Sequence, residues 1–189
     1  MTRTAASIVA VLLSLGAPRA YAQDSLVTVA GGLASTADER TSLLGGVATV
    51  DYHLSRRLSV VATVQRTTGT SGGYFSTWSW TDTFVGGGVR FSGRPWPRVE
   101  PFAHGLVGGI RIAGVERPDR IRPRGFVFVD GSYAKTVTAG IAGGGVSLYG
   151  TPRVGVRLGL DLYLQMFEGT LEVPQGRFTG ELVVGIGSR

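Results

Sequence analysis

Cysteine is absent from this 189-residue chain, and charged residues make up only 17% of it. The absence of cysteine excludes disulfides, thiolate metal sites and a cysteine nucleophile. Charged residues usually make up about 25% of a soluble domain, so their scarcity is unusual in a small chain with much surface to cover. The length accommodates one domain better than two.

Glycine, in contrast, is abundant, with 30 of the 189 residues, more than twice the usual share of about 7%. Because glycine inside a helix costs about 1 kcal/mol relative to alanine, this composition disfavours a helical protein. The formal net charge of +6 is scattered except in one loop. It forms no basic stripe interleaved with aromatic residues, so nucleic acid is not an expected partner.

The first 22 residues have the features of a secretory signal peptide. Arg3 precedes an apolar run over Ala5–Ala17, and Ala20-Tyr21-Ala22 places small residues at the two positions that signal peptidase recognises. The run is shorter than the roughly 20 residues that a membrane-spanning helix needs, and no later stretch supplies such a helix. We expect cleavage before Gln23 and a single exported domain over residues 23–189.

Alternation of apolar and polar residues with a period of two dominates the rest of the chain. In the segment 153–167 every second residue from Val154 to Met166 is apolar. This pattern predicts a strand, and its length suffices to cross a bilayer, for which about 9–11 tilted residues are needed. Similar patterns predict strands at 25–35, 44–54, 57–65, 81–91, 99–113, 133–148 and 177–187. Glycine and alanine leave the facing of 25–35, 99–113 and 133–148 open.

The connections between these segments alternate in length. Short ones lie at 55–56, 93–97 and 149–152, and longer ones at 67–78, 114–132 and 168–176. Such alternation is typical of transmembrane barrels. The predicted fold class is therefore all-β, a closed eight-stranded antiparallel up-and-down transmembrane β-barrel. Trp78 and Trp80 are then expected near the outer membrane interface, and Tyr52 and Phe91 near the inner one.

The polar faces of the predicted strands carry few charges and are rich in small residues, which suits a narrow packed interior better than a solvated exterior. Arginines and acids occur together on these faces, and charges closed off from water are costly unless they are paired. We therefore hypothesise an arginine–carboxylate network that plugs the lumen. Its members are Asp51, Asp82, Arg90, Arg111, Arg157, Asp161 and Glu181. Separately solvated charges in a wet lumen are the alternative.

Several short sequence segments resemble those of the small eight-stranded outer-membrane β-barrel family, the OmpA/OmpX-like and opacity-type barrels. They are Val50–Ser55 running into Leu58, Glu100-Pro101-Phe102 leading to Gly108-Gly109, and Gly143–Val146. The resemblance covers residues 23–189. It implies outer-membrane residence, insertion by the barrel-assembly machinery and usually no enzymatic activity. Family chains commonly end in an aromatic residue, whereas this chain ends in Arg189.

Few residues suggest catalytic chemistry. His53 lies two residues from Asp51, but a structural pair near a turn is the simpler interpretation, and no metal set can be built around His104. The glycine triplets 86–88 and 143–145 open no predicted helix and precede no Lys-Ser or Lys-Thr, so they are not phosphate loops. We predict no catalytic, cofactor-binding or metal site and expect no cofactor.

The loop 114–132 is the most distinctive segment, because it concentrates arginines. They are Arg117, Arg120, Arg122 and Arg124. Arginine forks suit phosphate recognition, so we hypothesise that this loop contacts the phosphates of lipopolysaccharide or a surface partner. A solvated loop that continues the barrel as a hairpin above the membrane is the alternative.

The sequence therefore predicts a monomeric, non-enzymatic integral protein of the outer membrane with a structural or surface-interaction role. Its expected partners are outer-membrane lipids, lipopolysaccharide and, during biogenesis, the barrel-assembly machinery. The alternatives are a lipid A-modifying barrel enzyme, a small porin-like channel and a soluble periplasmic lipocalin-like lipid carrier. Eight strands leave an interior just wide enough for side chains, which disfavours the channel.

Overall fold

The computed structural model describes residues 26–37, 42–72, 76–94, 96–118, 131–167, 170–171 and 175–187. Within these ranges the chain forms nine strands: β1 (Val27–Ala37), β2 (Ser42–His53), β3 (Leu58–Gly72), β4 (Ser76–Ser92), β5 (Val99–Pro118), β6 (Ser132–Tyr149), β7 (Val154–Phe167), β8 (Thr170–Leu171) and β9 (Gln175–Ile186). The predicted signal peptide lies outside the described residues. The described part of the chain contains no helix with the length and apolar character to span a membrane.

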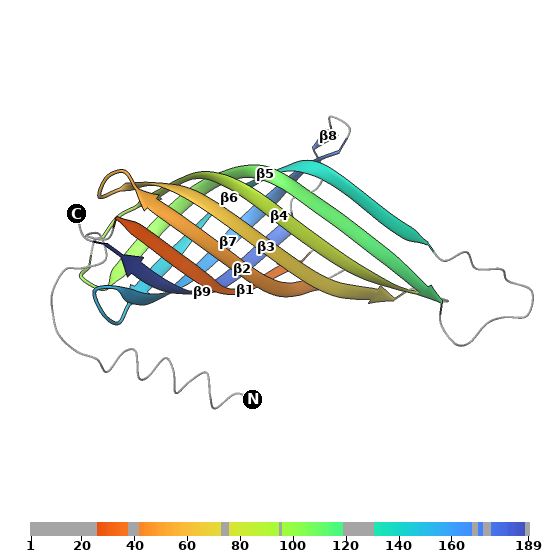
Figure 1. Ribbon diagram of the computed structural model, residues 1–189, viewed down its shortest axis with the longest axis horizontal. Helices are drawn as coiled ribbons and strands as arrows, with labels where there is room; N and C mark the ends of the chain where they lie inside the picture. Colours follow the sequence, from red (N-terminus) through yellow and green to blue (C-terminus); the bar gives the residue numbers. More distant parts are fainter. Residues whose placement is uncertain are drawn as a thin grey trace, which may run out of the picture.

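Eight of these strands close into an antiparallel barrel (Figure 1). Each strand from β1 to β7 pairs with the next one in the chain, and β9 pairs with both β7 and β1 to complete the circle. The two-residue β8 pairs only with the end of β7. The predicted eight-stranded up-and-down barrel is thus confirmed.

The register between strands determines the width of the barrel. A path that starts at Val27 and steps from each residue to its partner on the next strand returns to β1 at Ala37. The pairing is therefore staggered by ten residues around the barrel. Such a stagger requires tilted strands, typically by about 35–45° to the barrel axis, and eight strands enclose a space just wide enough for side chains. The oblique course of the strands is visible in Figure 1.

Side-chain hydroxyl groups stabilise two of the short turns. Ser55 Oγ accepts a hydrogen bond from the backbone N–H of Leu58 at 3.0 Å, and Thr151 Oγ1 accepts one from that of Val154 at 3.0 Å. Serine and threonine commonly make such bonds in turns. We call the end of the barrel with these turns the turn end and the opposite end the loop end. The turn end comprises residues 54–57, 93–94, 96–98 and 150–153.

The exterior of the barrel is apolar. Along β7 the outward positions from Val154 to Met166 are all valine, leucine or methionine, and Leu160 is 69% exposed. Tyr52 and Phe91 also point outward near the turn end. Monomeric soluble proteins rarely expose contiguous apolar patches larger than a few hundred Å². This surface therefore requires an apolar environment around it.

Three strands extend further toward the loop end than the alternation predicts. β3 continues to Gly72 rather than residue 65, β4 begins at Ser76 rather than residue 81, and β5 continues to Pro118 rather than residue 113. In these extensions the outward positions of β3 and β4 carry Arg66, glycine, threonine and serine instead of valine. In β3 both faces are then polar or glycine, and in β4 the apolar Trp78 and Trp80 lie on the inward face, so the pattern of an apolar exterior disappears although the backbone pairing continues.

Trp78 and Trp80 lie on the inward face of β4, on the same side as the buried Phe84. They stack on one another with ring centroids 5.2 Å apart, and Trp80 meets Tyr133 edge-on at 6.3 Å. Trp80 Nε1 also donates a hydrogen bond to Ser71 Oγ at 2.9 Å. The two tryptophans expected near the outer interface therefore face the interior of the barrel rather than its surroundings.

Candidate functional site: the charged interior

The interior of the barrel holds both an apolar cluster and a set of buried charges. The apolar cluster consists of Val61, Phe84, Leu106, Ile110, Val137, Ala139, Ile141 and Tyr163. The buried charged residues are Asp51, Arg90, Glu100, Arg157, Asp161, Arg177 and Glu181, each no more than 5% exposed. Charges at this depth are stable only where each has a partner of opposite sign.

Asp51 is the centre of the first charged group. Its Oδ1 accepts a hydrogen bond from Arg90 Nη1 at 2.6 Å, and its Oδ2 accepts one from Arg157 Nη2 at 2.7 Å. Arg157 Nη1 also lies 3.5 Å from Glu181 Oε2, and Arg157 Nε donates to Ser147 Oγ at 3.3 Å. One carboxylate thus links β2, β4 and β7 through charge-assisted hydrogen bonds, which are stronger than neutral ones.

The ring of Phe102 contacts both arginines that share Asp51. The guanidinium carbon of Arg90 lies 4.8 Å from the ring centroid and that of Arg157 lies 5.5 Å from it. A cation over an aromatic face is attracted to it, more strongly in a desolvated site. Two like charges are therefore held close together by a shared carboxylate and a shared ring.

Asp161 is the centre of a second group, which is adjacent to the first. Its Oδ2 lies 3.5 Å from Arg177 Nη1, and its Oδ1 lies 3.0 Å from His104 Nε2. The His104 ring stacks on Phe102 with centroids 5.6 Å apart. Phe102 therefore contacts both groups, and Arg177 additionally lies over the ring of Tyr163 at 5.8 Å.

Gly143 provides the space for the Asp161 carboxylate. A side chain at position 143 would overlap Asp161 Oδ1 and place its Cβ 2.5 Å from the carbonyl oxygen of Leu160. We expect Gly143→Ala to lower the free energy of unfolding by about 1–3 kcal/mol, because overpacking forces neighbours to move. Denaturant titration of the folded barrel, read by gel mobility without boiling, measures this.

Gly105→Ala is the matched control for that substitution. Nothing lies within 4 Å of a Cβ built at Gly105, so this variant should unfold at nearly the wild-type denaturant concentration. Equal stability of the two alanine variants would contradict the packing role of Gly143.

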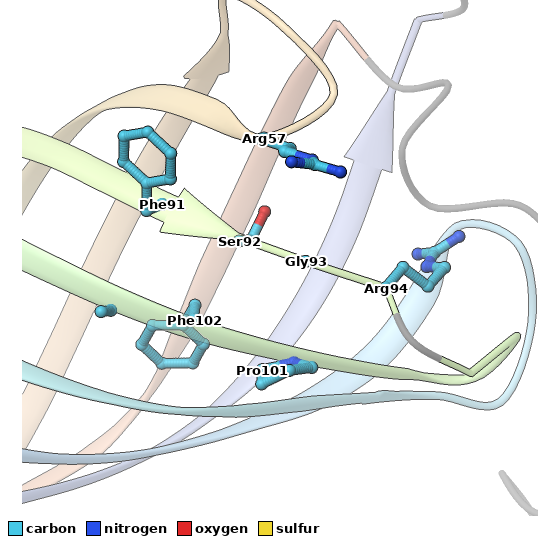
Figure 2. Close-up of a pocket in the computed structure, with 8 residues that line it drawn as sticks. Arg57, Phe91, Ser92, Gly93, Arg94, Pro101 and Phe102 are labelled. Atoms are coloured by element: carbon cyan, nitrogen blue, oxygen red, sulfur yellow. The ribbon is translucent and has the colours of Figure 1, made fainter.

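Arg94 and Glu100 close the interior at the turn end. Arg94 Nη2 donates to Glu100 Oε2 at 3.2 Å, and its guanidinium lies 5.2 Å from the centroid of Tyr149. A depression of about 600 Å³ adjoins this pair. Figure 2 shows the Arg57 side chain above Ser92 and the Arg94 side chain beyond Gly93. None of the eight residues that line the depression is a carboxylate or a histidine, so it offers no acid–base pair.

Two residues of the hypothesised network lie elsewhere. Arg111 is exposed. The preceding Ile110 is buried inside the barrel, and strand residues alternate in facing, so Arg111 lies on the outward face of β5. Its expected position in the lumen is corrected. Asp82 faces inward, but it is eight residues from Arg90 along β4, about 26 Å at the usual rise per residue. It therefore stands apart from the group around Asp51.

The arginines of the loop 114–132 fall largely beyond what the structure describes. Arg117 belongs to the end of β5, where only the backbone is described. Arg120, Arg122 and Arg124 lie outside the described residues.

Four interior residues were missed by reading the sequence: Arg94, Glu100, His104 and Arg177. Arg177 could have been found, since it is four residues before Glu181 on the same strand and therefore shares its face. Glu100 and His104 lie on β5, whose facing the sequence left open. Arg94 lies outside any strand, so no alternation applies to it.

His53 joins two neighbouring strands near the turn end. Its Nε2 lies 2.8 Å from Thr28 Oγ1 and its Nδ1 lies 2.8 Å from Ser59 Oγ. Ser59 is only 1% exposed, so its hydroxyl is positioned to join strands rather than to attack a substrate. Among the described residues, no group of three or more potential ligands is placed to hold a metal ion.

An apolar exterior around a charged, side-chain-filled interior in a closed barrel of eight strands defines the class of the small outer-membrane barrels. Solved structures of that class resemble this chain. Neisserial surface protein A matches 85% of this chain and 96% of its own with a TM-score of 0.61 at 13% identity. The attachment invasion locus protein Ail of Yersinia pestis matches 86% of this chain and 97% of its own with a TM-score of 0.54 at 15% identity.

Ail has also been solved in complex with the heparin analogue sucrose octasulfate, and that structure matches 86% of this chain and 97% of its own, with a TM-score of 0.52 at 13% identity. No protein-family model matches the sequence, and no curated protein matches it either. At these identities the likeness concerns the fold alone. At that level it confirms the resemblance to the OmpA/OmpX-like barrels.

Proposed function

We propose that this protein is an integral β-barrel of the outer membrane with a structural or surface-interaction role and no enzymatic activity. The observation that carries the proposal is the distribution of polarity, with an apolar exterior and paired charges inside. A soluble lipocalin-like carrier has the opposite arrangement, since it encloses its ligand in the barrel and presents polar residues to water. Residues 1–22 would direct export and be removed.

The charged interior supports a closed lumen rather than a channel or an enzyme. Asp51, Arg157 and Asp161 are 1–3% exposed, so no solute or substrate reaches them while the network is intact. Their contacts span β2, β4, β7 and β9. We therefore assign the network the structural role of plugging the lumen and tying opposite walls together.

Surface interaction is assigned to the loop end, where arginines concentrate. The proposal that Arg117, Arg120, Arg122 and Arg124 contact lipopolysaccharide phosphates or a surface partner rests on the fit of guanidinium forks to anionic oxygens. A barrel of similar fold binds a sulfated sugar, which supports an anionic partner for this chain. We further propose that the protein is a monomer inserted by the barrel-assembly machinery.

Membrane fractionation of the expressed full chain, combined with gel electrophoresis of unheated and boiled samples, tests the proposed location and fold. We expect the protein in the outer-membrane fraction, with a mobility that changes on boiling because a closed barrel survives in detergent until heated. A chain that lacks residues 1–22 is the control and should not be exported. A soluble periplasmic protein without a mobility shift would overturn the proposal and favour the lipid carrier.

A further inference from the structure

Only two charged side chains interrupt the apolar exterior among the outward strand positions whose side chains the structure describes. They are Arg66 on β3 and Arg111 on β5, and both are exposed. The other outward strand positions with described side chains carry aliphatic or aromatic residues, glycine, proline, serine or threonine. An arginine on this surface is unexpected and needs a reason.

The register places the two arginines side by side. Arg66 pairs with Thr83 of β4, and Thr83 pairs with Arg111. Since neighbouring strands are about 4.8 Å apart, the two arginine Cα atoms are separated by roughly 10 Å, with Thr83 between them. All three side chains lie on the same outward face of the sheet.

On β3 and β4 the exterior changes from apolar to polar at this trio. One outward row closer to the turn end lie Val64 and Val85, and one row closer to the loop end lie Thr68 and Thr81. An outward arginine costs about 2–4 kcal/mol at the centre of a bilayer but only about 0–1 kcal/mol near its interface. The trio therefore fits the headgroup level on the loop side of the membrane.

Two guanidinium forks and a hydroxyl, spaced in this way, match a phosphate group. Phosphate offers several acceptor oxygens, and arginine binds it through paired N–H donors. The aliphatic stems of the arginines can lie along the apolar surface while the charged ends reach the headgroups. A ligand approaching from the membrane would thus meet three donors within roughly 10 Å of one another.

We propose that Arg66, Thr83 and Arg111 form a binding site on the lipid-facing wall for the phosphate of an outer-leaflet lipid headgroup. The chemistry fits the phosphorylated sugar of lipid A. The inference rests on the proposed outer-membrane location, and it is separate from the hypothesis on the loop arginines, because the trio lies on the wall of the barrel.

The test compares binding of bisphosphorylated lipid A to the purified folded protein and to the Arg66→Gln/Arg111→Gln variant in zwitterionic micelles. We expect the double variant to bind roughly tenfold more weakly or worse, since it loses both charged donors. Thr83→Val should weaken binding to a lesser extent. The matched control is Arg56→Gln/Arg153→Gln, which removes two exposed arginines at the turn end and should bind as wild type does.

Two further binding comparisons identify the ligand. With dephosphorylated lipid A the difference between wild type and double variant should vanish. Full competition by inorganic phosphate at the concentration of lipid A would overturn the assignment to a lipid headgroup. Equal weakening in the turn-end control would overturn a local site.

Each protein variant used in the lipid A binding test is also fractionated and tested for a heat-dependent mobility shift. This control separates the failure of the phosphate site from the failure of the proposed function. A double variant that stays in the outer membrane as a folded barrel, yet binds lipid A as wild type does, would overturn only the phosphate site. A soluble wild-type protein would overturn the proposed function itself.

Discussion

Asp51→Asn is expected to lower the free energy of unfolding of the barrel by about 3–5 kcal/mol, because breaking a buried ion pair leaves uncompensated charge in the interior. Asp51 is 1% exposed and bonds both Arg90 and Arg157. Without its charge, the two guanidiniums are left beside one another over the ring of Phe102. The attraction of that ring is about 2 kcal/mol in desolvated sites and does not replace the carboxylate.

Denaturant titration of the folded protein in detergent or vesicles measures this loss through the mobility of unheated samples. Glu181→Gln is the matched control, because Glu181 is also buried but its ion pair with Arg157 is 3.5 Å long. Its loss should be smaller than that of Asp51→Asn. Equal stability of the two variants would contradict the central position of Asp51.

Arg157→Ala extends the same test to the plugging role of the network. This substitution removes a partner of both Asp51 and Glu181, so we expect lower stability and, from the space left inside, a rise in planar-bilayer conductance. If neither quantity changes, the network does not plug the lumen.

The sequence predicted interior residues best where alternation was uninterrupted. β7 alternates cleanly, and Arg157 and Asp161 lie inside as expected of its polar face. Both residues have an oppositely charged residue on the neighbouring strand β9: Arg157 stands opposite Glu181, and Asp161 stands opposite Arg177. Local pattern was sufficient here because the environments of the two faces differ along the whole strand.

β5 shows why the rest could not be predicted locally. Small and apolar residues occur on both of its faces, so hydrophobicity does not distinguish Arg111 from His104. Their facing follows from pairing with β4, where His104 stands opposite the buried Arg90 and Arg111 stands opposite the outward Thr83. The register between β4 and β5 is a property of the folded barrel, and the local pattern of β5 alone does not determine it.

Leu160→Arg is expected to lower the free energy of unfolding from a bilayer by about 2–4 kcal/mol, the cost of an arginine near the bilayer centre. Leu160 is 69% exposed and is the middle member of the outward apolar row on β7, with Val154 and Met166 at its ends. In a soluble barrel the same substitution would replace an exposed apolar group by a charge and should be nearly neutral.

Thr136→Arg is the control that ties this prediction to membrane depth. Thr136 is exposed and pairs with Arg111, in the row that also contains Arg66, so an arginine there should cost only about 0–1 kcal/mol. Reversible denaturant titration in phospholipid vesicles compares the two variants. A larger cost at position 160 than at 136 requires a medium that is apolar at one level and polar at the other, which only a membrane around this barrel supplies. Equal costs would contradict both the membrane-spanning wall and the boundary at Arg66 and Arg111.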